Sequence, residues 1–205
     1  MKIEVKPHHN RKELFIIYID GEPWREIHST IFGKHPKFSS VQNQEQWENF
    51  FHSYEYKRVK GYVTWRLSSL SYHSEQLEKL LRERLVPLDL IQQVIQEHKD
   101  IGALDDDLWM QRFLQQQQKK YGLKHIIQKL YAKGFSRETL ETISQSSDDG
   151  SDQAQELNVI KKLLISRYRS KDLTQYKEKQ KVIASLMRKG FSYDCIKEAM
   201  RDVDS

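Results

Sequence analysis

Residues 130–143, L-Y-A-K-G-F-S-R-E-T-L-E-T-I, and residues 186–199, L-M-R-K-G-F-S-Y-D-C-I-K-E-A, are two copies of one phrase. A weaker copy, L-R-E-R-L-V-P-L-D-L-I-Q-Q-V, occupies residues 81–94. Measured between their first leucines, the copies lie 49 and then 56 residues apart. Self-similarity with a period of this size indicates one supersecondary unit that is used repeatedly.

The phrase predicts the end of one helix and the start of the next. Helices often stop at a glycine in the left-handed conformation, which is followed by an apolar residue that folds back on the last turn. Gly134 and Gly190, each followed by Phe, fit that stop. Ser136 and Ser192 then suit the N-cap of the following helix, with an acidic residue in its first turn. We therefore predict that Gly134 and Gly190 are structural turn residues with positive φ.

The first copy departs from this pattern at two positions. Pro87 replaces the capping serine, and proline suits the start of a helix. Leu85 replaces the glycine at the stop, and a leucine disfavours the left-handed conformation. We therefore expect the turn of the first repeat to differ in conformation from the other two.

The composition indicates a polar, charged, helical protein. The chain has 205 residues and a formal net charge of +5, and its mean hydropathy is −0.78. No run of apolar residues is long enough for a transmembrane helix. The first ten residues lack the apolar core of a signal peptide, and the lone Cys195 excludes an internal disulfide and suits a reducing compartment. We expect a cytoplasmic protein.

Basic residues concentrate in two segments. Residues 119–137 contain six Lys or Arg and no acidic residue, and residues 161–189 contain ten Lys or Arg against two acidic residues. A basic face suggests an acidic or polyanionic partner. For any single lysine, a solvated helix face is the plainer interpretation.

The N-terminal part differs from the rest of the chain. The apolar residues Ile3 and Val5 alternate with charged residues, and residues 14–19, L-F-I-I-Y-I, form a dense β-prone run. Asp20-Gly21 is a hairpin signal, which predicts a small antiparallel sheet. A short helix over residues 45–54 would bury Trp47, Phe50 and Phe51.

From residue 58 onward, apolar residues recur at helical spacing in three groups, and residues 144–152 read as a polar linker. The predicted fold is mainly α: tandem three-helix repeats in an elongated array, preceded by the small β-sheet. The expected segments are a β-rich N-terminal part with a short helix (1–56), repeat 1 (57–104), repeat 2 (105–147) and repeat 3 (148–205).

No catalytic, metal or cofactor site is expected. Residues 105–107 are three aspartates, which suit the capping of a helix that starts near Leu108 better than metal binding. His8-His9 lacks a second pair of ligands for zinc, and no glycine-rich phosphate loop is present. Three tyrosines near basic residues could stack on bases, although helix packing is the commoner role: Tyr121, Tyr131 and Tyr168.

A chain of spaced positions resembles a known family. Residues 102–106, G-A-L-D-D, are followed by Trp109 and then by Phe113-Leu114, and residues 122–126, G-L-K-H-I, continue the pattern. Residues 188–196, R-K-G-F-S-Y-D-C-I, complete it. Over residues 58–200 the chain resembles the RecX family, which are small bacterial modulators of the RecA recombinase.

The resemblance implies a binding protein rather than an enzyme. RecX proteins lie in the helical groove of the filament that RecA forms on single-stranded DNA, bridge its protomers, and limit ATP hydrolysis, strand exchange and filament growth. The implied partners are this filament and, more weakly, DNA itself; no membrane partner is expected, and the chain is expected to be a monomer. The alternative is a helical protein that binds DNA independently of RecA.

On this interpretation the contacts with RecA or DNA come from basic residues in all three repeats. The candidates are Arg66, Arg82, Arg84, Lys119, Lys120, Lys124, Lys133, Lys161, Arg167, Arg169, Lys171, Arg188 and Lys189.

Overall fold

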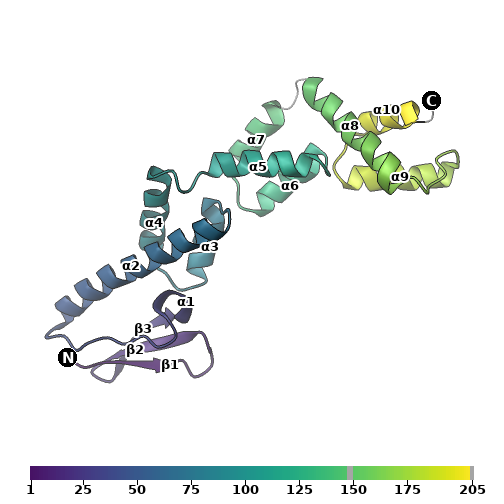
Figure 1. Cartoon of the computed structure of the whole chain (residues 1–205). Coiled ribbons are helices and arrows are strands. Elements are labelled where there is room, and N and C mark those ends of the chain that lie inside the picture. Colours follow the sequence, from purple (N-terminus) through teal and green to yellow (C-terminus); the bar gives the residue numbers. More distant parts are fainter. Residues whose placement is uncertain (147–149, 204–205) are drawn as a thin grey trace. The chain divides into compact units, whose positions relative to one another are not determined.

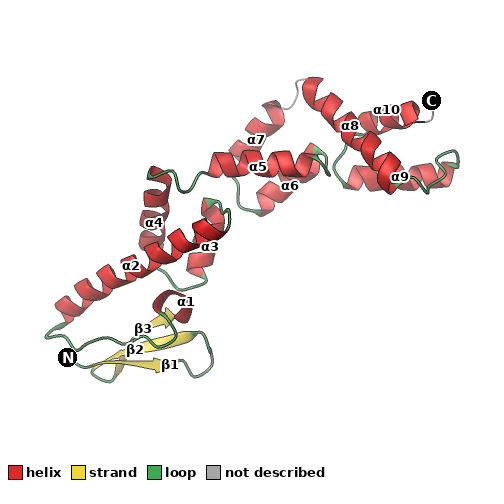
Figure 2. Ribbon diagram, in the orientation of Figure 1, coloured by secondary structure: helices red, strands yellow, loops and turns green. Residues whose placement is uncertain are grey.

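The computed structural model describes residues 1–146 and 150–203. The fold is mainly α with a small N-terminal sheet, as predicted (Figures 1 and 2). The strands are β1 (Ile3–Pro7), β2 (Leu14–Ile19) and β3 (Glu22–His28). The helices are α1 (Ser29–Phe32), α2 (Gln44–Ser69), α3 (Ser74–Arg82), α4 (Leu88–Asp100), α5 (Asp106–Gln118), α6 (Leu123–Ala132), α7 (Arg137–Ser146), α8 (Gly150–Arg167), α9 (Tyr176–Arg188) and α10 (Tyr193–Val203).

The three strands form one antiparallel sheet in the order β1-β2-β3. The predicted hairpin is confirmed, because β2 and β3 are joined by Asp20 with φ 48° and Gly21 with φ 95°. Two successive residues with positive φ give the turn whose twist suits a two-residue hairpin. Ile17 and Ile27 are fully buried in the core that the sheet shares with α2.

The chain divides into two compact units, Met1–Asp106 and Asp107–Ser205. The first unit contains the sheet, α1 and a first repeat of three helices, α2 to α4. The second unit contains a second repeat, α5 to α7, and a third repeat, α8 to α10. Each repeat has its own cluster of buried apolar residues.

Helix α2 corrects one expectation. The short helix expected over residues 45–54 continues without a break to Ser69, so the expected boundary between residues 56 and 57 lies inside α2. Nothing in this stretch breaks a helix, and Trp47, Phe51, Val59 and Val63 keep one face buried along its length. Phe50, which was expected to be buried, is 45% exposed.

The repeated turns confirm one prediction and overturn another. Gly134 and Gly190 have φ values of 98° and 86°, as predicted. Leu85 has φ 59°, so the first repeat uses the same left-handed turn and the expected difference in conformation is wrong. The buried Val86 that follows Leu85 is the physical reason, because it holds the chain in the fold-back position.

The hydrogen bonds of the three turns match one another. In each copy, the amide after the left-handed residue donates to the carbonyl oxygen of the leucine that opens the phrase, which is the Schellman pattern. These leucines have no exposed surface, so the turn is fixed against each core. The bonds run from Val86 to Leu81 (3.2 Å), from Phe135 to Leu130 (3.3 Å) and from Phe191 to Leu186 (3.4 Å).

Serine caps follow the two glycine turns, as predicted. The Ser136 hydroxyl accepts from the Thr139 amide at 3.2 Å, and the Ser192 hydroxyl accepts from the Cys195 amide at 3.2 Å. Cys195 is buried and free. These caps satisfy amides that the first turns of α7 and α10 leave without partners.

Asp106, one of the three successive aspartates, caps helix α3. It is the first residue of α5, and its carboxylate accepts from the amide of Ser74 at 2.7 Å and from the hydroxyl of Ser74 at 2.6 Å. Lys99 pairs with the same carboxylate at 2.9 Å. Asp106 therefore closes the start of α3, within the first unit. Burial alone would raise the pKa of Asp106, but these partners outweigh it and lower the pKa.

Both ends of the expected polar linker are helical. Residues 144–146 belong to α7 and residues 150–152 to α8, while residues 147–149 lie outside the described part of the chain. Among the described residues, no helix is long and apolar enough to cross a membrane.

Candidate functional site

The second and third repeats meet at two glycines. The Gly122 amide, in the turn between α5 and α6, donates to the carbonyl oxygen of Lys189 at 3.0 Å. A Cβ at Gly122 would lie 2.2 Å from the carbonyl oxygen of Gly190, and a Cβ at Gly190 would lie 2.4 Å from the amide nitrogen of His125. Backbone therefore packs directly against backbone, and only glycine permits this approach.

Tyr121 lies beside this contact, among basic side chains. The Nζ atom of Lys129 is 3.6 Å from the centre of the Tyr121 ring, and the Nζ atom of Lys189 is 5.0 Å from it. His125 stacks on the same ring at 4.7 Å between centroids. The ring brings together two lysines that are 60 residues apart in the sequence.

The electrostatic environment of His125 reflects this clustering. Burial lowers the pKa of His125, and the positive charges of Lys129 and Lys189 lower it further. The electrostatic potential around His125 is therefore positive in the free protein. We call the set Lys119, Lys120, Lys124, Lys129, Arg188 and Lys189 the basic junction.

The basic junction lacks acidic partners. No ion pair joins any of its members to a carboxylate among the residues that the structure describes. Lys119, Lys120, Lys124 and Arg188 are exposed, so their charges face solvent. Exposed cations without acidic partners favour a polyanion or an acidic protein surface as the partner.

Other candidates in the second unit lie in different surroundings. Lys133 lies over the rings of Trp109 and Phe113, at 5.4 and 5.6 Å. Lys161 pairs with Asp202 at 2.6 Å, and Lys171 pairs with Glu178 at 2.9 Å. Arg167 and Arg169 are exposed at the end of α8 and just after it.

The three candidates in the first unit contact other residues of the first repeat. The Arg66 guanidinium lies 5.3 to 5.8 Å from the rings of Tyr62, Trp65 and Tyr72. Arg84 donates to the Leu80 carbonyl oxygen at 2.7 Å.

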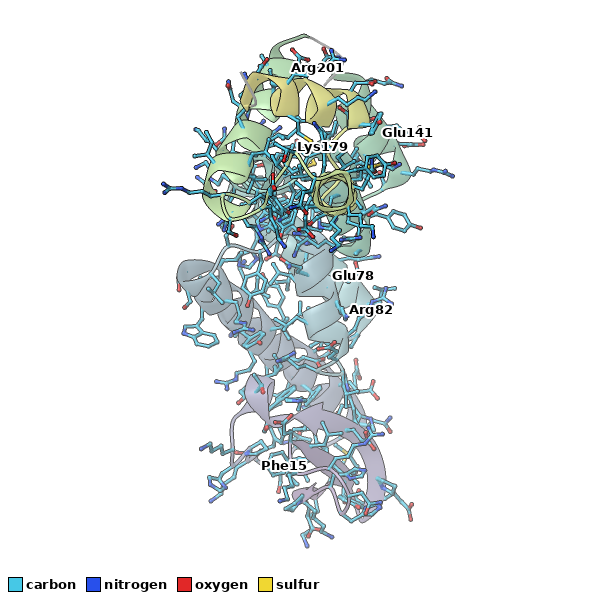
Figure 3. All side chains as sticks on the ribbon, turned by 90° about the vertical axis from the view of Figure 1, so that its right-hand side faces the viewer. Phe15, Glu78, Arg82, Glu141, Lys179 and Arg201 are labelled. Atoms are coloured by element: carbon cyan, nitrogen blue, oxygen red, sulfur yellow. The ribbon has the colours of Figure 1, made fainter. Side chains whose placement is uncertain are left out.

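Arg82 is exposed and forms an ion pair with Glu78 one turn earlier on α3. Figure 3 shows both side chains on this helix.

Two members of the site were missed as candidates, His125 and Lys129. Lys129 belongs to the acid-free segment 119–137, so the charge pattern could have identified it. Its contact with Tyr121, which lies eight residues earlier and before α6, was not visible in the sequence. Of the three tyrosines near basic residues, Tyr168 packs in the third repeat and its hydroxyl hydrogen-bonds with that of Ser185 at 2.8 Å, whereas Tyr131 is 68% exposed.

Within the described residues, no group of three His, Cys, Asp or Glu side chains is placed to hold a metal ion.

The sequence comparisons agree with this architecture. The family model described as "RecX, third three-helix domain" matches residues 154–200, which cover α8 to α10 apart from their ends. Regulatory protein RecX of Streptococcus agalactiae serotype III (strain NEM316) is 37% identical over 98 residues. Regulatory protein RecX of Streptococcus equi is 26% identical over 194 residues, which is 91% of this chain and 72% of that protein.

These matches support a place for the chain in the RecX family. A crystal structure of regulatory protein RecX shares the fold, with a TM-score of 0.58 and 19% identity over 96% of this chain and 97% of that one. RecX from Lactobacillus salivarius has the same TM-score, with 22% identity over 73% of this chain and 96% of that one. RecX is a family of regulatory proteins and not a known enzyme family.

The coverage of the relatives is partial. The aligned part spans 45% of this chain and 38% of the S. agalactiae protein. For Listeria welshimeri RecX, which is 31% identical, it spans 62% of this chain and 49% of that protein.

Proposed function

We propose that this chain docks in the groove of the RecA filament on single-stranded DNA and inhibits its ATP hydrolysis, strand exchange and growth. The basic junction is the observation that carries the proposal. It presents six cations without acidic partners in the described residues, around a backbone contact between two repeats. A groove lined by acidic protein surface and DNA phosphate offers the complementary charge.

The kind of surface available supports a regulatory role. Repeated three-helix units display side chains from successive helices, which suits binding along a repeating partner. Exposed lysines and arginines supply electrostatic attraction and set orientation.

Co-sedimentation tests the docking. RecA filaments are formed on single-stranded DNA with a slowly hydrolysed ATP analogue, and the chain is added at increasing concentration. The proposal expects the chain to pellet with the filaments at concentrations that leave it in the supernatant with DNA alone. Equal pelleting with and without RecA would favour the alternative function.

That alternative is a helical protein that binds DNA independently of RecA. The position of Lys129 and Lys189 over the Tyr121 ring favours it, because aromatic rings close to cations occur at sites for single-stranded nucleic acid. It predicts strong DNA binding that weakens steeply with salt in the absence of RecA.

A further inference from the structure

We propose that the contact between the second and third repeats binds one unstacked base of single-stranded nucleic acid. The turn between α5 and α6 lies beside the turn between α9 and α10 (Figure 1). A cavity of about 80 Å³ opens at this place. Its lining residues are Gln118, Tyr121, Gly122, Leu123, Gln153, Gln155, Glu156 and Phe191.

The chemistry of the lining suits a nucleobase. Gln118, Gln153 and Gln155 each carry an amide with donors and an acceptor, which can pair with the edge of a base. Tyr121 and Phe191 add aromatic surface to the cavity wall. Together they offer the edge contacts and the ring contacts that unstacked bases use.

The remaining polar group of the lining already has a partner. The Glu156 carboxylate accepts from the amide of Ser192 at 2.8 Å and so supports the start of α10. Its charge is partly satisfied within the third repeat, which leaves the glutamine amides as the groups available to a base.

The phosphate of the same nucleotide has its own partners. Tyr121 lines the cavity and also carries Lys129 and Lys189 over its ring. Lys119 and Lys120 directly precede it in the sequence and are exposed. A base in the cavity therefore places its phosphate among cations that have no acidic partner in the described residues. A peptide segment could use the amides, but it would leave these cations without phosphate, so nucleic acid is the favoured occupant.

A weak bond across the cavity permits opening. The Gln155 Nε2 atom donates to the Gln118 Oε1 atom at 3.5 Å, between exposed parts of the two side chains. A bond of this length is weak and exchanges readily with water. Rotation of these two side chains admits the edge of a base and replaces their mutual bond with bonds to it.

This inference rests on the proposed contact with single-stranded DNA, but its test does not need RecA. The full chain is titrated onto a fluorescent thymidine oligonucleotide and onto an oligonucleotide of equal length and charge with abasic sites. Anisotropy is measured over a range of salt concentrations. The base-containing strand should bind at least about fivefold more tightly, because stacking of one base contributes on that scale.

Two variants separate the base from the phosphate. The double variant Gln118→Ala and Gln155→Ala should lose the preference for bases and keep the salt dependence. The double variant Lys129→Gln and Lys189→Gln should weaken binding to both strands and reduce the salt slope by about one. Gln180→Ala, at an exposed glutamine of α9, is the control and should change neither quantity.

Equal affinity of the wild-type chain for both strands would overturn the inference, and so would glutamine variants that keep the preference for bases. Loss of RecA inhibition in the glutamine variants with unchanged oligonucleotide binding would assign the cavity to a peptide and also overturn it. A wild-type preference for bases that the glutamine variants lose, in a chain that fails to inhibit RecA, would support the inference and contradict the proposed function.

Discussion

The amide of Gly122 donates a 3.0 Å hydrogen bond to the carbonyl oxygen of Lys189, and this bond joins the second repeat to the third. It lies where the backbone of Gly122 meets the backbone of Gly190, with no side chain between them. The positions of Tyr121 and of the basic junction therefore depend on two residues that carry no charge.

Gly122→Ala should separate the two repeats locally. The new Cβ would lie 2.2 Å from the Gly190 oxygen, so the backbones must move apart. We expect a loss of about 1–3 kcal/mol in the free energy of unfolding, the usual range for overpacking. Gly61→Ala is the matched control, because nothing lies within 4 Å of its Cβ in helix α2, and it should stabilise the chain. Denaturant unfolding that places both variants at wild-type stability would contradict the close contact.

Substitutions at the left-handed turns should change stability in opposite directions at the leucine and at the glycines. Leu85→Gly should raise the free energy of unfolding by up to about 1 kcal/mol, because it relieves a φ of 59° that leucine disfavours. Gly134→Val and Gly190→Val should each lower it by about 1–3 kcal/mol. Thermal melts of the three variants test both predicted changes in stability. A destabilised Leu85→Gly variant would show that the contacts of the leucine side chain contribute more to stability than its backbone strain costs.

Charge reversal should locate the binding surface. Replacement of Lys119, Lys120 and Lys124 by Glu, or of Arg167, Arg169 and Lys171 by Glu, should weaken filament binding. Each lost contact should contribute about 1 kcal/mol or less at an exposed rim.

Reversal of Lys34, Lys37 and Lys57 is the matched control. These exposed lysines of the first unit lie outside the candidate set, and their reversal changes the net charge by the same amount. Circular dichroism should report unchanged helicity in all three variants. Equal losses of binding in all three would mean that net charge, rather than either surface, governs the interaction.

DNA binding should strengthen as pH falls. The pKa of His125 is lowered in the free protein by burial and by Lys129 and Lys189, so the ring is neutral at pH 7. A phosphate among these lysines favours the charged ring, which raises the pKa, and binding then takes up a proton. Affinity should rise as pH falls through the interval between the free and the bound pKa values.

His125→Gln tests this dependence directly. His125 is the only histidine after residue 98, so the second unit has no other group of this kind. Anisotropy titrations should show a flatter pH dependence in the variant than in the wild-type chain. An unchanged slope would assign the proton uptake to another group.

The sequence allowed the repeat and its turns to be predicted, because glycine, phenylalanine and serine at fixed spacing each have a local conformational meaning. Leu85 was misjudged, because the burial of Val86 holds a left-handed leucine that local preference disfavours. The continuity of α2 was missed for a related reason. Its buried face extends through residues 47–63, and no sequence signal marks a continuous helix apart from the absence of a breaker.

The charged residues of the candidate site could be predicted from the sequence, but their arrangement in space could not. The acid-free segment 119–137 identified the charges. The approach of Gly122 to Gly190 depends on the packing of two repeats, and a single sequence carries no signal for contacts between repeats. Tyr121 and His125 acquire their surroundings from that contact.

The most direct measurement is the rate of ATP hydrolysis by RecA on single-stranded DNA with increasing amounts of this chain. The account predicts that hydrolysis slows when the chain is present at less than one molecule per RecA protomer, because a groove-bound molecule bridges neighbouring protomers. The variant with Lys119, Lys120 and Lys124 replaced by Glu should require a higher concentration for the same effect. A rate that is unchanged at equimolar protein would contradict the account.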